Sequence, residues 1–108
     1  MRSPHRRSKD QEKKIAKARE GEVTIASGAL PWQKADVVDK YFLTEAKYTD
    51  KKSYSITKAT WEKIKNQSQD KGLMPSMVID ITGTDSLTVI RSDDFNWMIQ
   101  RVNWEEEL

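Results

Sequence analysis

The sequence predicts an α/β protein in which a mixed central β-sheet is flanked by helices. Helical patterns occur near both ends of the chain and once in its middle, at 8–19, 57–70 and 92–102. Short segments rich in β-forming residues lie between them, first as a group of three and then as a group of two. Helices that alternate with groups of strands favour a mixed sheet covered by helices.

The first helix is predicted to follow a short basic tail. Residues 1–7 combine a proline with clustered charge and have little to bury, so we expect them to be disordered. Ser8 followed by Gln11 has the spacing of a capping box, which predicts a helix start at Ser8. The pattern continues to about Arg19, and Gly21 marks the end of the helix.

Three strands are expected between the first and second helices. Residues 23–26 form a short apolar segment, and the small and breaking residues at 27–31 predict a loop. Residues 35–38 and 41–48 then predict a β-hairpin that turns at 39–40, because the second arm is rich in aromatic and β-branched residues.

The second helix is expected to begin after Thr57, whose hydroxyl can cap it. It should reach about Asp70 and end at Lys71 and Gly72. Its predicted inward-facing residues are Ile56, Ala59 or Thr60, and Ile64.

Two strands and a last helix complete the fold. Strands are predicted at 77–81 and 87–90, separated by a turn at 82–85. Ser92 is the expected cap of the last helix, whose apolar residues recur at helical spacing and should face the core. These residues are Phe95, Met98, Ile99 and Val102.

Length and composition limit the chain to one modest domain, which we expect at 8–108. There is no cysteine, which excludes disulfides and thiolate metal sites and is compatible with the cytoplasm. No apolar run approaches the ~20 residues of a membrane helix, so no membrane partner is expected. Residues 1–20 carry eight basic and three acidic groups, which suits either a polyanion such as DNA or a solubilising tail.

The predicted hairpin gathers two acids and a lysine on one face. Strand side chains alternate, so Glu45 and Lys47 share a face with Leu43. A tight turn at 39–40 places Asp36 opposite Leu43, one diagonal step from Glu45, at ~7–8 Å between Cα atoms. Two carboxylates at this spacing can share one cation.

The apolar neighbours of these acids imply burial, and buried like charges repel unless a positive group is present. A divalent cation would neutralise both carboxylates, and oxygen ligands favour Mg²⁺, or Mn²⁺ in its place. Such an ion activates water against a phosphodiester, with Lys47 steadying the developing charge. The alternative is an exposed edge held by salt bridges.

Glu12 adds a possible further ligand. It lies one turn before Ile15 and Ala16, the expected inward residues of the first helix, and so points to the same side. The alternative is an ordinary glutamate in a first helical turn, where the helix dipole favours negative charge.

Taken together, Glu12, Ser27-Gly28, Asp36 and Glu45-Ala46-Lys47 resemble the pattern of the PD-(D/E)XK nuclease superfamily. Their order over about residues 8–81 is similar to its Holliday junction resolvase branch of archaeal and phage type. Two departures occur: Ala35 stands where the family often has glycine, and the proline before the aspartate is absent. Neither departure removes a catalytic group.

The resemblance implies a role for each motif residue. Asp36 and Glu45 would bind the metal with the carbonyl of Ala46, and Lys47 would be the catalytic lysine. Glu12 would assist the metal or the water, and Ser27 would lie near the scissile phosphate.

The resemblance also implies a Mg²⁺-dependent endonuclease that acts on four-way DNA junctions as a homodimer, because two symmetric nicks suit a two-fold protein. Trp61 and Trp97 are then expected in the core or the dimer contact. The candidate phosphate contacts are Lys9, Lys13, Lys51, Lys52, Ser53 and Lys58.

Two other functions remain open from the sequence. A nuclease of the same fold that acts on flaps, nicks or ends would share every catalytic residue. A non-catalytic module that binds DNA or protein would use the same acids and lysine as a salt-bridge cluster. The single histidine, His5, lies in the expected tail, which argues against histidine-based acid–base chemistry.

Overall fold

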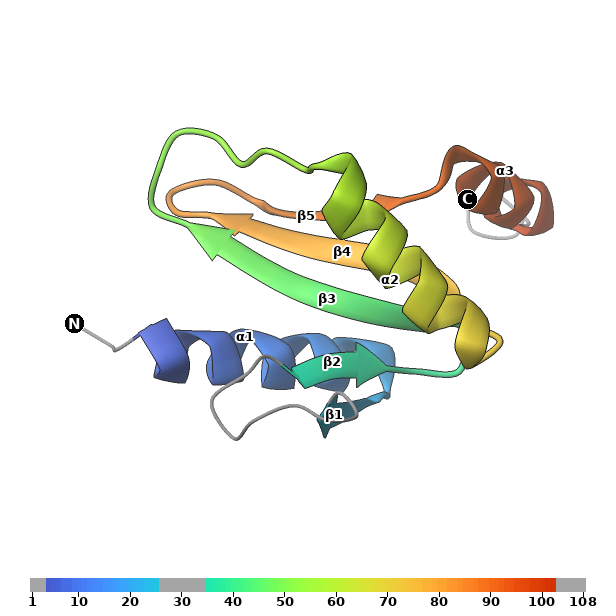
Figure 1. The fold of residues 1–108 in the computed structure, drawn as a ribbon, viewed down its shortest axis with the longest axis horizontal. Helices are drawn as coiled ribbons and strands as arrows, with labels where there is room; N and C mark the ends of the chain where they lie inside the picture. Colours follow the sequence, from blue (N-terminus) through green and yellow to red (C-terminus); the bar gives the residue numbers. More distant parts are fainter. Residues whose placement is uncertain (1–3, 26–34, 103–108) are drawn as a thin grey trace.

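The computed structural model describes residues 4–25 and 35–102. Within these residues the chain is an α/β protein whose helices and strands follow one another in the predicted order (Figure 1). The elements are α1 (Pro4–Arg19), β1 (Glu22–Ile25), β2 (Ala35–Val38), β3 (Phe42–Thr49), α2 (Lys58–Asp70), β4 (Met74–Ile81), β5 (Ser86–Ile90) and α3 (Ser92–Arg101).

The described strands form one mixed sheet in the order β1-β2-β3-β4-β5. Strand β3 runs parallel to β4, and the other neighbours are antiparallel. The parallel pair needs a crossover, which α2 supplies between β3 and β4. The predicted mixed sheet flanked by helices is therefore confirmed.

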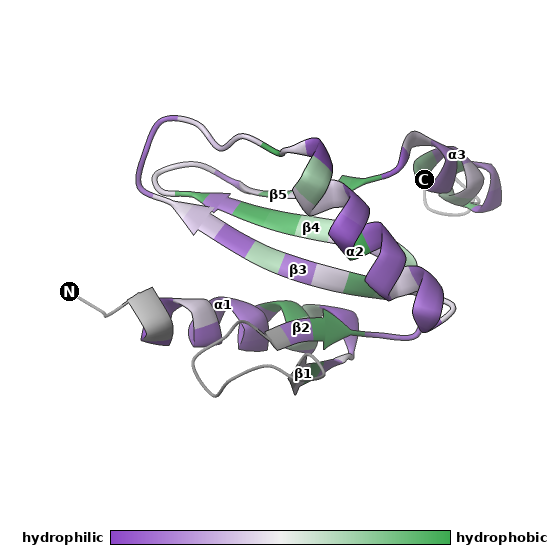
Figure 2. Ribbon diagram, viewed as in Figure 1, coloured by the Kyte–Doolittle hydropathy of each residue, from purple (hydrophilic) through white to green (hydrophobic). Residues whose placement is uncertain are grey.

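Helices α1 and α2 cover opposite faces of the sheet, and each closes a small core. Ile15 and Ala16 of α1 pack with Val37, Ala46 and Val78. On the other face the buried residues are Leu43, Ile64, Met77 and Ile79. Strand β4 is hydrophobic along most of its length, whereas β3 mixes apolar and polar residues (Figure 2), so polar side chains of β3 enter the covered part of the sheet.

Helix α1 begins earlier than predicted. It starts at Pro4, so Ser8 lies inside the helix and is not its N-cap, and residues 4–7 are not a disordered tail. Contacts of Arg7 help to keep residues 4–7 helical, because its guanidinium donates to Oδ1 of Asp50 at 2.7 Å and lies over the ring of Tyr48. The capping-box spacing of Ser8 and Gln11 therefore does not mark the start of α1, because the contacts of Arg7 with Asp50 and Tyr48 hold an additional turn at its N-terminus.

The end of α1 lies close to β2. Glu20 adopts a left-handed conformation (φ 55), and the amide of Gly21 donates to the carbonyl of Ala16 at 2.8 Å. A Cβ on Gly21 would lie 2.6 Å from the carbonyl oxygen of Val38. Glycine is therefore required where the chain passes the end of β2.

The caps of α2 agree with the prediction, but one of its expected core residues does not. Thr57 accepts from the amide of Thr60, and Gly72 follows the helix with φ 68. Ile64 is fully buried. Ile56 precedes the helix and is 39% exposed, so its predicted inward position is wrong.

Helix α3 does not pack as predicted. Its N-cap is Arg91 rather than Ser92, and Asp94, paired with Arg91 at 2.8 Å, is its buried residue. The helix projects beyond β5, away from α1 and β2 (Figure 1). The predicted inward face is therefore exposed, namely Phe95, Met98, Ile99 and Val102.

No helix within the described residues is long and apolar enough to cross a membrane.

Candidate active site

The turn between β2 and β3 sets the register of the candidate site. Asp39 accepts from the amides of Tyr41 and Phe42 through Oδ1, which closes a longer turn than predicted. Val38 consequently pairs with Leu43 rather than Tyr41. The predicted register is wrong by two residues, but a shift of two keeps every side chain on its predicted face.

The corrected register brings Asp36 and Glu45 closer than the prediction did. Strands β2 and β3 pair at only two positions, Val37 with Thr44 and Val38 with Leu43. Continuing this pairing by one step sets Asp36 directly opposite Glu45. Beyond this point β2 and β3 diverge (Figure 1), so the two acids face each other where the sheet opens.

Both acids lie on the face covered by α2. Val37 and Ala46 belong to the core under α1, and alternation turns Asp36 and Glu45 to the other side. Both carboxylates are buried, each residue being only 8% exposed. The predicted convergence on one face is therefore present.

The environment of Asp36 is costly for a negative charge. Burial raises the pKa of its carboxyl to about 6, and the negative charge of Glu45 adds to the rise. Lys63, Lys71 and Lys47 act in the opposite direction. Lys63 belongs to α2 and Lys71 is its C-cap, and no motif in the sequence indicated either of them.

Lys47 extends the cluster along β3. Its Nζ lies 2.9 Å from Oε1 of Glu45, and both side chains are largely buried. The carbonyl of Lys47 accepts from Nε2 of Gln11, at 2.7 Å, so α1 fixes this end of the strand from the opposite face. Asp36, Glu45 and Lys47 thus form a row of two acids and an amine on the face of the sheet that α2 covers.

Glu12 is buried, as its position beside Ile15 predicted, with an exposed fraction of 4%. It belongs to α1, however, on the face opposite to Asp36 and Glu45. No cluster of three or more acidic or histidine side chains suited to an ion occurs among residues 4–25 and 35–102. The structure thus gathers two of the three predicted carboxylates.

The remaining predicted residues lie around this cluster or outside the described chain. Ser27 and the loop at 27–31 are outside the described residues, as are the acidic residues at 105–107. Trp61 packs against the core under α2, whereas Trp97 is 45% exposed and stacks with Arg101. The predicted phosphate contacts are exposed: Lys9, Lys13, Lys51, Lys52, Ser53 and Lys58.

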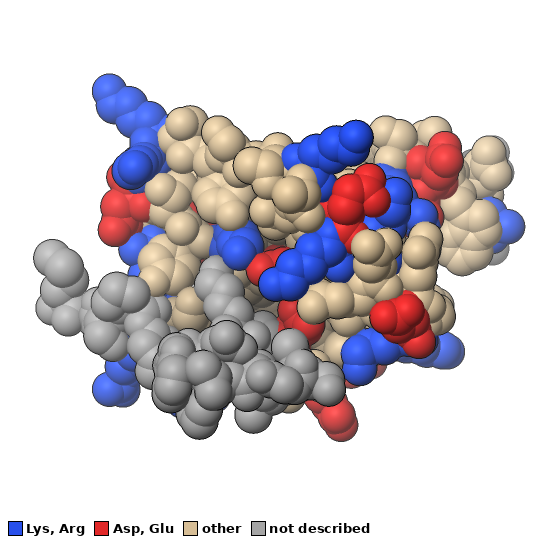
Figure 3. All heavy atoms as spheres, viewed as in Figure 1, with Lys and Arg blue, Asp and Glu red and all other residues tan. Residues whose placement is uncertain are grey.

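Acidic and basic groups meet in the middle of the face that carries α2. Figure 3 shows acidic atoms between lysine and arginine atoms at this point, and both acidic and basic groups around the rim. Acids of this kind can bind a cation, while the basic groups beside them attract a polyanion.

No protein-family model matches the chain, and no match among curated proteins was found. The nuclease resemblance therefore stays a prediction carried by the motif residues.

Proposed function

We propose that this protein is a metal-dependent DNA endonuclease of the PD-(D/E)XK type, with resolution of four-way junctions as its task. The observation that carries the proposal is the buried pair Asp36 and Glu45, which face each other where β2 and β3 part, with Lys47 at 2.9 Å from Glu45. Three elements of the motif are thus adjacent in space.

The donor set fits a hard divalent cation. Two carboxylates in a buried place repel each other, and the raised pKa of Asp36 expresses that repulsion together with burial. Asp36 and Glu45, with the carbonyl of Ala46, would hold Mg²⁺ or Mn²⁺. The bound ion would polarise the phosphodiester and activate water for hydrolysis.

The protein's own groups would position the DNA strand. The ammonium of Lys47 is held by Glu45 and lies on the same face as both acids, where it would steady negative charge on the scissile phosphate. Lys63 of α2 and Lys71 at its C-cap act electrostatically on Asp36, and we propose them as further phosphate contacts beside the site. Glu12 and Ser27 remain proposed assisting residues.

The exposed lysines at the rim fit a DNA partner read through its backbone. Lys9 and Lys13 lie on α1, Lys51, Lys52 and Ser53 lie between β3 and α2, and Lys58 begins α2. A homodimer would cut a four-way junction, because the two nicks are related by two-fold symmetry. We propose the cytoplasm as the place of this reaction.

The proposal is tested by cutting of a synthetic four-way junction with and without Mg²⁺. Asp36→Asn, Glu45→Gln and Lys47→Met should each slow cleavage by more than about 100-fold, while junction binding in EDTA persists. Lys40→Met is the matched control, since Lys40 is an exposed lysine at the hairpin turn and should leave the rate unchanged.

Three other outcomes would change the proposed site, activity or substrate. If Asp36→Asn cuts as fast as wild type, the site is wrong. If wild type binds the junction but cuts no DNA at any divalent metal concentration, the protein is a binding module. Faster cutting of flap or linear duplex DNA than of the junction would reassign the substrate within the nuclease class.

A further inference from the structure

We infer that the apolar face of α3 and the groove beside it form the surface through which two copies of this chain associate. The inference rests on the dimeric part of the proposed function but not on its chemistry. The α3 surface is defined here as Phe95, Met98, Ile99 and Val102 together with the groove residues Tyr41, Phe42 and Ile90.

The helix side of this surface is apolar and uncovered. Phe95 is 52% exposed, and its neighbours on the same face are exposed by more than a third. These residues recur one helical turn apart, which is the pattern of a helix that packs against another surface. Among the described residues, α3 makes few contacts with the other elements.

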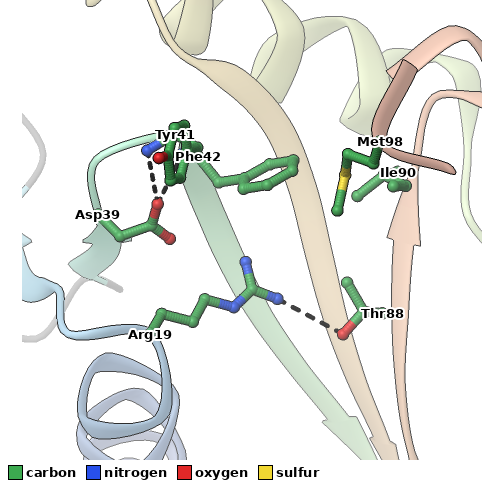
Figure 4. Close-up of a pocket in the computed structure, with 7 residues that line it drawn as sticks. All are labelled: Arg19, Asp39, Tyr41, Phe42, Thr88, Ile90 and Met98. Atoms are coloured by element: carbon green, nitrogen blue, oxygen red, sulfur yellow. Dashed lines mark hydrogen bonds between the residues drawn. The ribbon is translucent and has the colours of Figure 1, made fainter. Parts of the chain in front are cut away.

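The groove side adjoins the helix side through Met98, which belongs to both. Its volume is about 300 Å³, and its walls come from Tyr41, Phe42, Ile90 and Met98 (Figure 4). Arg19 lies at its base and donates to the hydroxyls of Thr44, Ser76 and Thr88. Asp39 also lines the groove, and its buried Oδ2 has no hydrogen-bond partner among the described residues, so one unsatisfied carboxylate oxygen lies behind the apolar walls.

A second copy is the occupant that suits this surface. An exposed aromatic ring, Phe95, and an apolar groove lie on the same surface, so two copies related by a two-fold axis can each insert a ring into the other. Such self-complementarity is what an isologous contact requires.

Charge also favours association at this end of the molecule. Residues 86–102 carry two arginines and two aspartates, and Arg91 and Asp94 are paired with each other. Helix α1, in contrast, has seven basic and two acidic residues, so copies that met there would repel. Helix α3 follows β5, the edge strand farthest from β1 and β2, while the groove reaches back to the β2–β3 turn through Tyr41 and Phe42. The groove lies on the α1 face of the sheet, whereas Asp36 and Glu45 lie on the face that α2 covers.

Sedimentation equilibrium of the full chain tests this inference between roughly 1 and 200 µM, where small interfaces associate. Wild type should reach a dimer, and Phe95→Glu and Ile99→Lys should each weaken association at least about tenfold. Trp97→Glu is the matched control, because Trp97 is a similarly exposed aromatic residue on the opposite side of α3 and should leave the dimer intact.

Two results would overturn the inference. A wild-type monomer throughout this range would leave the α3 surface to another protein or to residues 103–108. Unchanged dimerisation of both Phe95→Glu and Ile99→Lys would place the contact elsewhere. Mg²⁺-dependent nicking by a monomeric wild type would preserve the proposed chemistry, whereas a dimer without nuclease activity would preserve the α3 surface and remove the chemistry.

Discussion

Asp36 is the residue at which burial and charge oppose ionisation most clearly. Its carboxyl has an ordinary pKa of 3.8, which burial and Glu45 raise to about 6 in the folded protein. The folded protein therefore holds an extra proton between these values, and the free energy of unfolding falls as the pH rises from about 4 to 6. Ionised Asp36 destabilises the metal-free protein at neutral pH.

Asp36→Asn should consequently raise the free energy of unfolding of the metal-free protein at neutral pH. We expect about 1–2 kcal/mol, less than the full shift implies, because the nearby lysines and solvent screen the charge. Urea unfolding in EDTA measures it, and the gain should disappear below about pH 4, where both forms are neutral. The exposed Asp85→Asn is the control, and an equal gain at both pH values would contradict the account.

Residue alternation explains why the site was predictable although its register was not. The faces of Asp36, Glu45 and Lys47 follow from the period of two in a strand, which survives a register shift of two. The hydrogen bond that the amide of Phe42 donates to Oδ1 of Asp39 lengthens the turn; it depends on the local backbone and was not visible in the sequence.

At the scale of elements, the packing of α1 against β2 depends on one glycine. Gly21→Ala should lower the free energy of unfolding by about 2 kcal/mol, because the added Cβ meets the carbonyl oxygen of Val38, a backbone atom that cannot move alone. Thermal unfolding measures the loss.

The neighbouring position provides a control of opposite sign. Glu20→Gly should stabilise the protein by up to about 1 kcal/mol, since Glu20 has a positive φ that glycine adopts freely. If Gly21→Ala is neutral while Glu20→Gly stabilises, α1 does not approach β2 as closely as described.

Element types were predictable, but element partners were not. The period of α3 correctly predicts an amphipathic helix, yet it carries no information on whether the apolar face meets the chain's own core or another surface. The early start of α1 likewise depends on Arg7 reaching Asp50, which is 43 residues away in the sequence. Local sequence patterns therefore predict the type of an element but not the residues that it contacts in the folded protein.

At the scale of the whole molecule, the candidate site lies at the weakest junction of the sheet. Strands β3 and β4 pair along eight positions, whereas β2 and β3 pair at two. Asp36 and Glu45 lie on either side of that junction, and an ion between them would link the two parts of the sheet. The succession of helices and strands along the chain was predictable from the sequence, but the order of the strands within the sheet and this opening depend on long-range packing.

Whether Asp36 and Glu45 hold a divalent ion can be measured by calorimetric titration of the metal-free protein with Mn²⁺ at neutral pH. We expect saturable binding to wild type, lost in Asp36→Asn and in Glu45→Gln and retained in Asp85→Asn. No binding to wild type, or equal binding to Asp36→Asn, would show that these two carboxylates do not hold a divalent ion.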